Sequence, residues 1–378
     1  MRLLRWLNST GLVLTALLFS PALHAAEYFV YFGTFTDSTS TGIYVSRFDP
    51  DNGKLSAPQL AAESDEPSFL AVAPNHRFLY AVNEFNGDNG TVTAFQIDAK
   101  TGKLTQLNQQ TSGGVRPAHL VVDASGKFVV AANYLSGNVE VLPIKADGSL
   151  GAPVSVAQDQ GSSIDTQRQD GPHAHCIAMD ASNRVYVCDL GADKVMIYDL
   201  DAQSGQLTTN GIPWATMTPG SGPRHIALHP DGKYAYVISE LASTMTAFAR
   251  NPSSGELTQL QTLSTLPEDF HGNNTGAEVA IHPSGKFLYG SNRGYNSITT
   301  FAIDEKTGKL NRIQIEPVPG KTLRSFAIDP TGQFLIAGGQ DSDNVVVFRI
   351  NPKNGKLVPT GQNLDLGEPV CVMFVPEE

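Results

Sequence analysis

A Gly-x-Leu tripeptide recurs seven times along the chain, and this repeat restricts the fold more than any other feature of the sequence. The copies are Gly53-Lys54-Leu55, Gly102-Lys103-Leu104, Gly148-Ser149-Leu150, Gly205-Gln206-Leu207, Gly255-Glu256-Leu257, Gly308-Lys309-Leu310 and Gly355-Lys356-Leu357. Successive glycines lie 49, 46, 57, 50, 53 and 47 residues apart. Self-similarity at such a period is typical of propellers and solenoids, in which each repeat is one supersecondary unit.

Each repeat has the same order of apolar runs and turns. In residues 223–240 an apolar run meets the turn Pro230-Asp231-Gly232, and a second apolar run follows. A turn of this kind between two apolar runs predicts a β-hairpin. Residues 243–248 then predict a third strand, and a fourth follows the turn at 251–255. Four strands in each unit are typical of a propeller blade.

The seventh unit is divided between the two ends of the chain. Six units are complete, whereas residues 368–376 match a first strand and residues 28–34 and 42–48 match a second and a third. Pairing of these segments would close the ring and leave no open edge. The sequence therefore predicts an all-β, seven-bladed β-propeller over residues 27–378, with ring closure between the N- and C-terminal strands. A β-sandwich is the alternative, but it does not need seven matched units.

The first 26 residues predict an export signal. Arg2 and Arg5 precede an apolar run at residues 12–19, Pro21 interrupts it, and residues 22–26 offer small side chains for cleavage. An uncleaved membrane anchor is the alternative, but the run is too short to span a bilayer. We therefore expect residues 1–26 to be a signal peptide, the mature protein to be periplasmic, and no membrane association after the signal is removed.

Charge and cysteine content exclude several other classes. A net charge of −11 argues against nucleic acid as a partner. Three cysteines are an odd number, so a disulfide framework is not expected. Cys176 and Cys188 are predicted neighbours in one hairpin and could pair, or they could be buried free thiols. We expect no metal and no cofactor, although Glu84, Glu240 and Asp189 could ligate a cation.

The repeat also provides an internal control, because a residue that breaks it at an equivalent position is a functional candidate. The first strand of each unit begins, and the second ends, at the same end of the propeller, here called the mouth. The start positions hold Ser68, Ala118, His175, Arg224, Ala277, Arg324 and Val370. The end positions hold Thr34, Glu84, Tyr134, Leu190, Glu240, Arg293 and Gln340. Unusual charge therefore converges on one mouth, although hairpin salt bridges alone could also explain it.

The other histidines mostly occupy repeated positions. His119 and His225 share one position, which favours a shared structural hydrogen bond. His229 and His282 stand where other blades have aspartate before the hairpin turn, so they also read as structural. His173 precedes His175 by two residues, and either could point inward. Residues 157–171 and 264–276 form longer connections than their counterparts and could build the wall of a pocket.

Three segments match a known pattern, namely Arg168-Gln169-Asp170-Gly171-Pro172-His173-Ala174-His175, Gly222-Pro223-Arg224-His225 with Glu240, and Ser291-Asn292-Arg293-Gly294. Together they resemble the seven-bladed lactonase family, which includes bacterial 6-phosphogluconolactonase and the fungal carboxy-cis,cis-muconate lactonizing enzyme. The resemblance covers essentially the whole mature chain. It implies catalytic roles for His175 (or His173), Arg224, Glu240 and Arg293.

Residues around these four are expected to contact the substrate, namely His173, Glu84, Arg324, Gln340 and Arg168. Lys321-Thr322-Leu323 precedes Arg324 where relatives often have proline, so the pattern departs there. Export favours a member similar to a periplasmic gluconolactonase, which opens glucono-δ-lactone to gluconate. A 6-phosphogluconolactonase, a muconate-type cycloisomerase and a non-catalytic binding propeller are the alternatives.

The resemblance also suggests a mechanism of hydrolysis that needs no metal. His175 is the expected general base, because imidazole titrates near neutral pH. Glu240 is the alternative base, or it orients the water or Arg224. Arg224 and Arg293 are expected to stabilise the oxyanion. The expected partner is a small sugar lactone, and the protein is expected to be a monomer.

Overall fold

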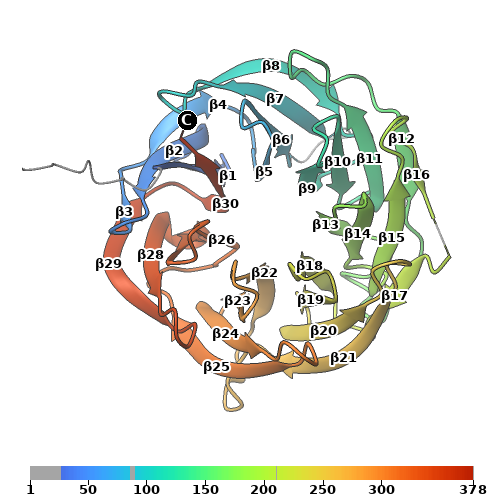
Figure 1. Ribbon diagram of the computed structural model, residues 1–378, viewed down its shortest axis with the longest axis vertical. Coiled ribbons are helices and arrows are strands. Elements are labelled where there is room, and N and C mark those ends of the chain that lie inside the picture. The colour runs from blue at the N-terminus through green and yellow to red at the C-terminus, as the bar shows by residue number, and fades with distance from the viewer. Residues whose placement is uncertain (1–26, 86–89, 210, 378) are drawn as a thin grey trace, which may run out of the picture.

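Seven antiparallel sheets surround a common axis and form a closed ring (Figure 1). The structure is a computed structural model that describes residues 27–85, 90–209 and 211–377, so the predicted signal peptide lies outside the described residues. Besides strands, this part of the chain has one short 3₁₀ turn, η1 (Gln340–Ser342). It includes no helix long and apolar enough to cross a membrane. The predicted all-β, seven-bladed propeller is confirmed.

Each blade runs from an inner strand at the axis to an outer strand at the rim. The inner strands are β5 (Phe69–Val72), β9 (Pro117–Val122), β13 (Ala174–Met179), β18 (Pro223–Leu228), β22 (Thr275–Ile281), β26 (Ser325–Ile328) and β30 (Pro369–Pro376). The second strands are β1 (Tyr28–Thr34), β6 (Phe78–Asn83), β10 (Phe128–Asn133), β14 (Arg184–Asp189), β19 (Tyr234–Ser239), β23 (Phe287–Arg293) and β27 (Phe334–Gly339).

The third and outer strands complete the blades. The third strands are β2 (Gly42–Asp49), β7 (Thr91–Ile97), β11 (Asn138–Pro143), β15 (Lys194–Leu200), β20 (Thr244–Arg250), β24 (Ser297–Ile303) and β28 (Asn344–Ile350). The outer strands are β3 (Lys54–Leu55), β4 (Gln59–Glu63), β8 (Leu104–Thr111), β12 (Ser155–Gln158), β16 (Leu207–Thr208), β17 (Trp214–Thr216), β21 (Leu257–Ser264), β25 (Leu310–Pro317) and β29 (Leu357–Asp365).

The hydrophobic core lies between neighbouring blades rather than at the axis. The second strand of a blade is buried on both faces, as in β10 and β19, because each face packs against another blade. The buried apolar side chains accordingly divide into seven clusters around the ring. This core leaves the axis free for polar side chains from the inner strands.

The Gly-x-Leu repeat marks a contact between adjacent blades. Tyr236 in β19 donates a hydrogen bond of 3.0 Å from its hydroxyl to the carbonyl of Gly308 in the next blade. Four other second-strand tyrosines make the same bond, namely Tyr31 to Gly102, Tyr80 to Gly148, Tyr186 to Gly255 and Tyr289 to Gly355. Gly308 has a φ of +68° and a Cβ there would lie 2.2 Å from the Tyr234 ring, so a side chain is excluded twice.

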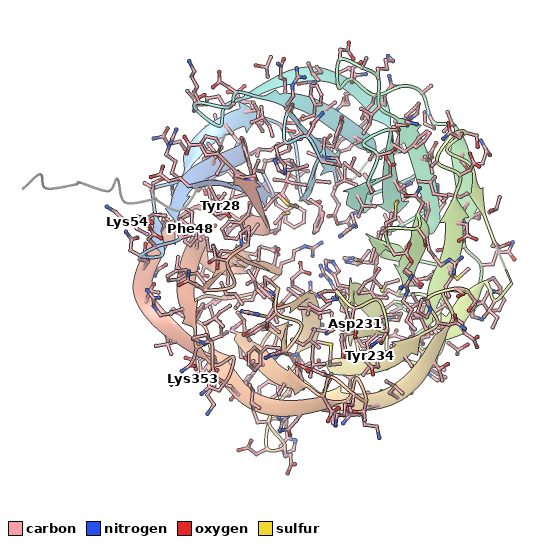
Figure 2. The ribbon with its side chains drawn as sticks, viewed as in Figure 1. Tyr28, Phe48, Lys54, Asp231, Tyr234 and Lys353 are labelled. Atoms are coloured by element: carbon pink, nitrogen blue, oxygen red, sulfur yellow. The ribbon has the colours of Figure 1, made fainter. Side chains whose placement is uncertain are left out.

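Ring closure occurs where the sequence predicts it. β30 from the C-terminus pairs antiparallel with β1, with Tyr28 opposite Pro376. β1 also pairs with β2, which places Tyr28 opposite Phe48, and both are labelled in Figure 2. The side chains of Lys54 and Lys353 lie at the outer rim of the ring (Figure 2). The termini therefore meet within one blade, and the inner strands keep fixed positions around the axis.

Candidate active site

The inner strands of five blades have a β-bulge at the mouth. In β18, Pro223 pairs with Ser239 and His225 pairs with Ile238, so Arg224 is the extra residue. The residues at the five bulges are Ala118, His175, Arg224, Ala277 with Glu278, and Val370. A bulge re-aims a side chain away from the sheet. Five of the seven start positions predicted from the repeat are therefore bulge positions of the fold, and Ser68 and Arg324 are the other two.

Glu240 organises three guanidinium groups at this mouth. Its Oε2 accepts from Arg224 Nε at 3.1 Å and lies 2.7 Å from Arg293 Nη2. Its Oε1 accepts from Arg168 Nη2 at 2.6 Å. Arg224 is 2% exposed and donates a further bond of 2.9 Å to the carbonyl of Ala277. The structure thus brings Arg224, Glu240 and Arg293, which were predicted to be catalytic, into one cluster. Arg168, which was predicted to contact the substrate, belongs to the same cluster.

The charges of this cluster are strongly coupled. Burial raises the pKa of Glu240, but Arg293, Arg224 and Arg168 outweigh burial and bring the pKa to about 2. Glu240 therefore stays ionised near neutral pH and is a weak base. Burial lowers the pKa of Arg224 to about 9, and Arg293 and Arg324 act in the same direction. Arg224 stays charged at neutral pH, and an anion beside it would be stabilised.

A second carboxylate, Glu84, has its own arginines. Its Oε1 lies 3.2 Å from Arg116 Nη2, and its Oε2 lies 3.5 Å from Arg324 Nη2. Ser68 also donates to Oε2 at 2.7 Å. The two clusters together hold five guanidinium groups and two carboxylates. The surplus of positive charge suits a substrate or transition state that is negatively charged.

His175 is the histidine that enters the centre of the site. It is 4% exposed, and its ring lies 5.6 Å from the Tyr134 ring and 5.2 Å from the His225 ring. Among the described residues its buried Nδ1 has no hydrogen-bond partner. Burial lowers the pKa of His175 well below its usual value, and the charge of Arg224 adds to this. The expectation that His175 titrates near neutral pH is therefore wrong. The neutral ring is nevertheless the form that a general base requires.

His173 has a different environment from His175. Its ring stacks on Tyr134 at 4.8 Å, and its Nδ1 lies 2.9 Å from the carbonyl oxygen of the same tyrosine. Its backbone N–H donates to Asp189 at 2.8 Å. A ring held in this way is less free to take a proton from a substrate water. The structure therefore favours His175 as the histidine in the site, and His173 as a residue of the wall.

A buried pair of carboxyl groups supports the segment that bears these histidines. Asp189 Oδ2 and Asp159 Oδ2 are both buried, and neither receives a donor from the described residues. Burial, and then the charge of Asp189, raise the pKa of Asp159 to about 8. Tyr198 donates its hydroxyl to the other oxygen of Asp159. One proton shared by the two carboxyl groups would satisfy both oxygens.

We expect Asp159→Asn to stabilise the protein at alkaline pH. The raised pKa means that the folded state keeps a proton that the unfolded chain releases above pH 4, so stability falls as pH rises from about 4 to about 8. Asparagine keeps an acceptor for Tyr198 and donates to Asp189 without a charge. Thermal unfolding from pH 5 to 9 should show a gain of about 1–2 kcal/mol at pH 9 that shrinks towards pH 5. Parallel curves for variant and parent would contradict a shared proton.

Other predicted residues have varied outcomes. Gln340 begins η1, and its side chain makes no hydrogen bond to the described residues, so its role in substrate binding stays a prediction. The long connection 157–171 does contribute to the site, because it carries Arg168. Arg116 was missed. Tyr134 was placed at the mouth but not named as a substrate contact, and its hydroxyl accepts a bond of 3.0 Å from Arg168 Nη2. Arg116 lies two residues before a start position, outside the aligned rings.

The residue after each start position forms a second layer, here called the lower tier. Its members are Phe69, His119, Cys176, His225, Glu278, Ser325 and Cys371. In the described chain, possible ligand atoms of His119, Cys176 and His225 lie within 4.8 Å of one another. However, His119 Nδ1 accepts the N–H of Ile177 at 3.3 Å, so the other nitrogen of its neutral ring bears the proton. These residues therefore do not fit a metal site of three ligands.

The structural histidines and the cysteines can also be assigned. His229 Nε2 lies 2.9 Å from the Gly285 carbonyl, and His282 Nε2 lies 2.8 Å from the Gly332 carbonyl, so their structural role is confirmed. His119 and His225 do not share one hydrogen bond, because their Nδ1 atoms have different partners. Cys176 and Cys188 are opposite each other across β13 and β14, yet both are free and buried. The disulfide between them is not formed.

Comparison with known proteins decides the family. The sequence matches the family described as "Lactonase, 7-bladed beta-propeller" over residues 29–374. The chain belongs to the seven-bladed β-propeller lactonase family. It is 40% identical to 6-phosphogluconolactonase of Bacillus subtilis over 301 residues, which cover 79% of this chain and 84% of that protein. It is 35% identical to 6-phosphogluconolactonase of Formosa agariphila over 307 residues, covering 79% of this chain and 85% of the other.

A solved structure agrees with these relatives. The lactonase resembles the periplasmic gluconolactonase PpgL of Pseudomonas aeruginosa with a TM-score of 0.88 and 34% identity, covering 93% of this chain and all of the other. The family and its relatives identify the chain as a lactone-hydrolysing enzyme. A propeller that only binds a ligand or a protein is therefore set aside. The arginines and His175 of this lactonase lie on the inner strands or at the mouth, and Arg168 and Arg116 are the most exposed of them.

Proposed function

We propose that this lactonase hydrolyses glucono-δ-lactone to gluconate in the periplasm. The observation that carries the proposal is the buried His175 ring, whose Nδ1 has no partner among the described residues, in the same mouth as the three arginines that pair with Glu240. The substrate and compartment are supported by the likeness to PpgL. The apolar run and small residues within residues 1–26 support export.

The proposed reaction begins with a water beside His175. The imidazole takes a proton from the water as the oxygen attacks the lactone carbonyl carbon. Negative charge then develops on the carbonyl oxygen, and Arg224 and Arg293 stabilise it as fixed donors. Collapse of the tetrahedral intermediate breaks the ring C–O bond, and the proton on His175 passes to the leaving oxygen. Glu240 keeps the two guanidinium groups in place and is not the base, because its pKa is about 2.

The proposed chemistry uses only side chains of the chain itself. A buried guanidinium lacks the water that would otherwise screen it, so its attraction to an oxyanion is strong. Arg168 and Arg324, with Arg116 behind Glu84, would orient the hydroxyl groups and later the carboxylate of the product. The proposal includes no metal and no cofactor, a sugar lactone as the partner and a monomeric protein.

Hydrolysis of 6-phosphogluconolactone is the second candidate. Two observations favour it, namely the surplus of guanidinium groups at the mouth and the names of the relatives from Bacillus subtilis and Formosa agariphila. A phosphate dianion would pair well with arginine. The proposed location outside the cytoplasm argues for the unphosphorylated lactone instead.

A substrate panel tests the choice. The protein, purified after export, is mixed with glucono-δ-lactone, 6-phosphogluconolactone and a carboxymuconolactone, and acid release is corrected for spontaneous opening. We expect the highest kcat/KM with glucono-δ-lactone. A higher value with the phosphorylated lactone would establish the second candidate, and reversible cyclisation of a muconate would indicate a cycloisomerase. Cell fractionation with N-terminal sequencing of the mature protein checks export, and recovery of the intact chain in the cytoplasm would contradict it.

A further inference from the structure

A largely buried glutamate, whose side chain is 13% exposed, lies in the lower tier next to the start position of its blade. Glu278 occupies the bulge of β22, where the register passes from Gly276 to Val279. Its Oε1 lies 2.8 Å from His225 Nδ1 and accepts the N–H of Val279 at 3.1 Å. Its Oε2 is 3.4 Å from the Ser325 hydroxyl. No other blade has a carboxylate in the lower tier.

The burial of Glu278 needs an explanation other than stability. A buried carboxylate loses its hydration, and apolar residues of similar volume often stabilise a fold as well or better. Other lower-tier positions, such as Phe69 and Cys371, show that the propeller tolerates apolar or small side chains there. Glu278 therefore stands out as a group placed for its charge.

His225 connects this carboxyl group to the proposed base. Its Nδ1 faces Glu278, while its ring lies 5.2 Å from the His175 ring at an interplanar angle of 60°. The same ring lies 5.4 Å from the His119 ring. Among the described residues, His225 is thus the titratable group that both bonds Glu278 and lies against the His175 ring. The sequence of contacts is the Glu278 carboxyl group, the His225 imidazole and the His175 imidazole.

We propose that Glu278 and His225 form a positioning pair that controls the protonation of His175 during lactone hydrolysis. The proposal rests on the function proposed above for His175. Ionised Glu278 accepts the Nδ1 proton of His225, which leaves Nε2 of His225 as an acceptor. Protonated Glu278 donates to Nδ1 instead, and Nε2 then bears the proton. The charge and the tautomer beside His175 therefore change together, without any net movement of heavy atoms.

The ionised pair favours the reaction. His175 becomes positive when it takes the proton from water, and nearby positive charges oppose that step. The charged or titratable groups that act on His175 are Arg224, His225, Arg324 and Arg293. The charged or titratable groups that interact with Glu278, by a hydrogen bond or through their charge, are His225, His119, Arg224, Cys176 and Cys371. Glu278 is the negative charge of the lower tier, so its ionisation stabilises the imidazolium of His175.

Burial also brings the pKa of Glu278 close to neutral pH. It raises the pKa of Glu278 to about 7, with Arg224 and His119 opposing the shift. The ionised fraction therefore grows as the pH rises through 7. Since the pKa of His175 is well below 6.5, the two ionisations should be separable in a pH profile.

Glu278→Gln tests the pair through the pH dependence of kcat/KM. The parent should show a rising limb near pH 7, and the variant should lose this limb and fall roughly tenfold below the parent at pH 8. The matched control is Glu140→Gln. Glu140 is another buried glutamate with a pKa raised to about 7, but it lies on the third strand β11. The control should keep the limb. A limb that persists in Glu278→Gln, or a uniform loss at every pH, would overturn the proposal.

A second measurement does not depend on the substrate. Nitrogen NMR of ¹⁵N-histidine-labelled enzyme, with His225 assigned by the loss of its signals in His225→Asn, reports the tautomer of the resting protein. We expect the Nδ1–H form of His225 to gain population between pH 6 and 8 in the parent and to be insensitive to pH in Glu278→Gln. A pH-independent tautomer in the parent would contradict the pair even if lactone hydrolysis is confirmed. A tautomer change without lactonase activity would locate the failure in the proposed reaction instead.

Discussion

Replacement of Glu240 by glutamine should nearly abolish hydrolysis and also weaken the fold. The change leaves the guanidinium groups of Arg224, Arg293 and Arg168 around a neutral amide. Loss of one partner from a buried ion pair costs about 3–5 kcal/mol of unfolding free energy. Misplaced oxyanion donors should lower kcat by about 10²–10³-fold. Steady-state kinetics and urea unfolding of the same preparation measure the two effects.

A buried ion pair at the opposite end of the propeller provides the matched control. Arg250 pairs with Asp180, which lies in the hairpin turn after β13, and both side chains are nearly buried. Asp180→Asn should therefore lower the unfolding free energy while kcat and KM stay at the parent values. If both variants lose activity in proportion to stability, Glu240 has a structural role only. If Glu240→Gln keeps full activity, the arginine cluster is not the site of the oxyanion.

The sequence was sufficient for the architecture because the repeat reflects contacts that recur in every blade. Gly308 and its counterparts accept a bond from a tyrosine of the preceding blade, so the glycines are spaced as the blades are. The split seventh unit predicted the pairing of β1 with β30 for the same reason. Alignment of the blades also found Arg224 and Glu240, because a bulge recurs at equivalent positions.

The rest of the site depends on contacts that no repeat encodes. Arg168 reaches Glu240 from the long connection 157–171, and its contact cannot be derived from blade spacing. Arg116 reaches Glu84 from a position just before an inner strand. Glu278 was overlooked because the bulge of β22 contains two residues, and alignment of single positions selected Ala277. Glu278 is the carboxylate among the seven lower-tier residues, whose other members are histidines or uncharged side chains. This exception to the repeat could have identified it from the sequence.

The pKa of His175 could not be derived from its residue type. An imidazole is expected to titrate near pH 6.5 in water. In the fold, burial is the largest influence, and Arg224 and His225 add to it. The arginines that prepare the site for an oxyanion therefore also keep the base neutral. This coupling links the two halves of the proposed mechanism, because each positive charge that stabilises the oxyanion opposes protonation of His175.

His175→Ala should accordingly lower kcat by about 10²–10⁴-fold, with a smaller effect on KM. The variant removes the proposed base but leaves Arg224 and Arg293 to bind the lactone. In the parent, the loss of activity that follows protonation of His175 should occur well below pH 6.5, since burial and the neighbouring arginines lower its pKa. Initial rates from pH 4.5 to 8.5 measure both effects, and spontaneous opening must be subtracted at each pH.

His282→Asn is the control for this substitution, because His282 bonds the Gly332 carbonyl at the far hairpin turn and should affect stability alone. Activity of His175→Ala within tenfold of the parent would exclude His175 as the base. Glu240 could not readily replace it, because a carboxylate with a pKa of about 2 gains little by taking a proton from water. The attacking water would then have to be activated by polarisation of the carbonyl between Arg224 and Arg293 alone, and the limb that reports protonation of His175 would be absent from the profile.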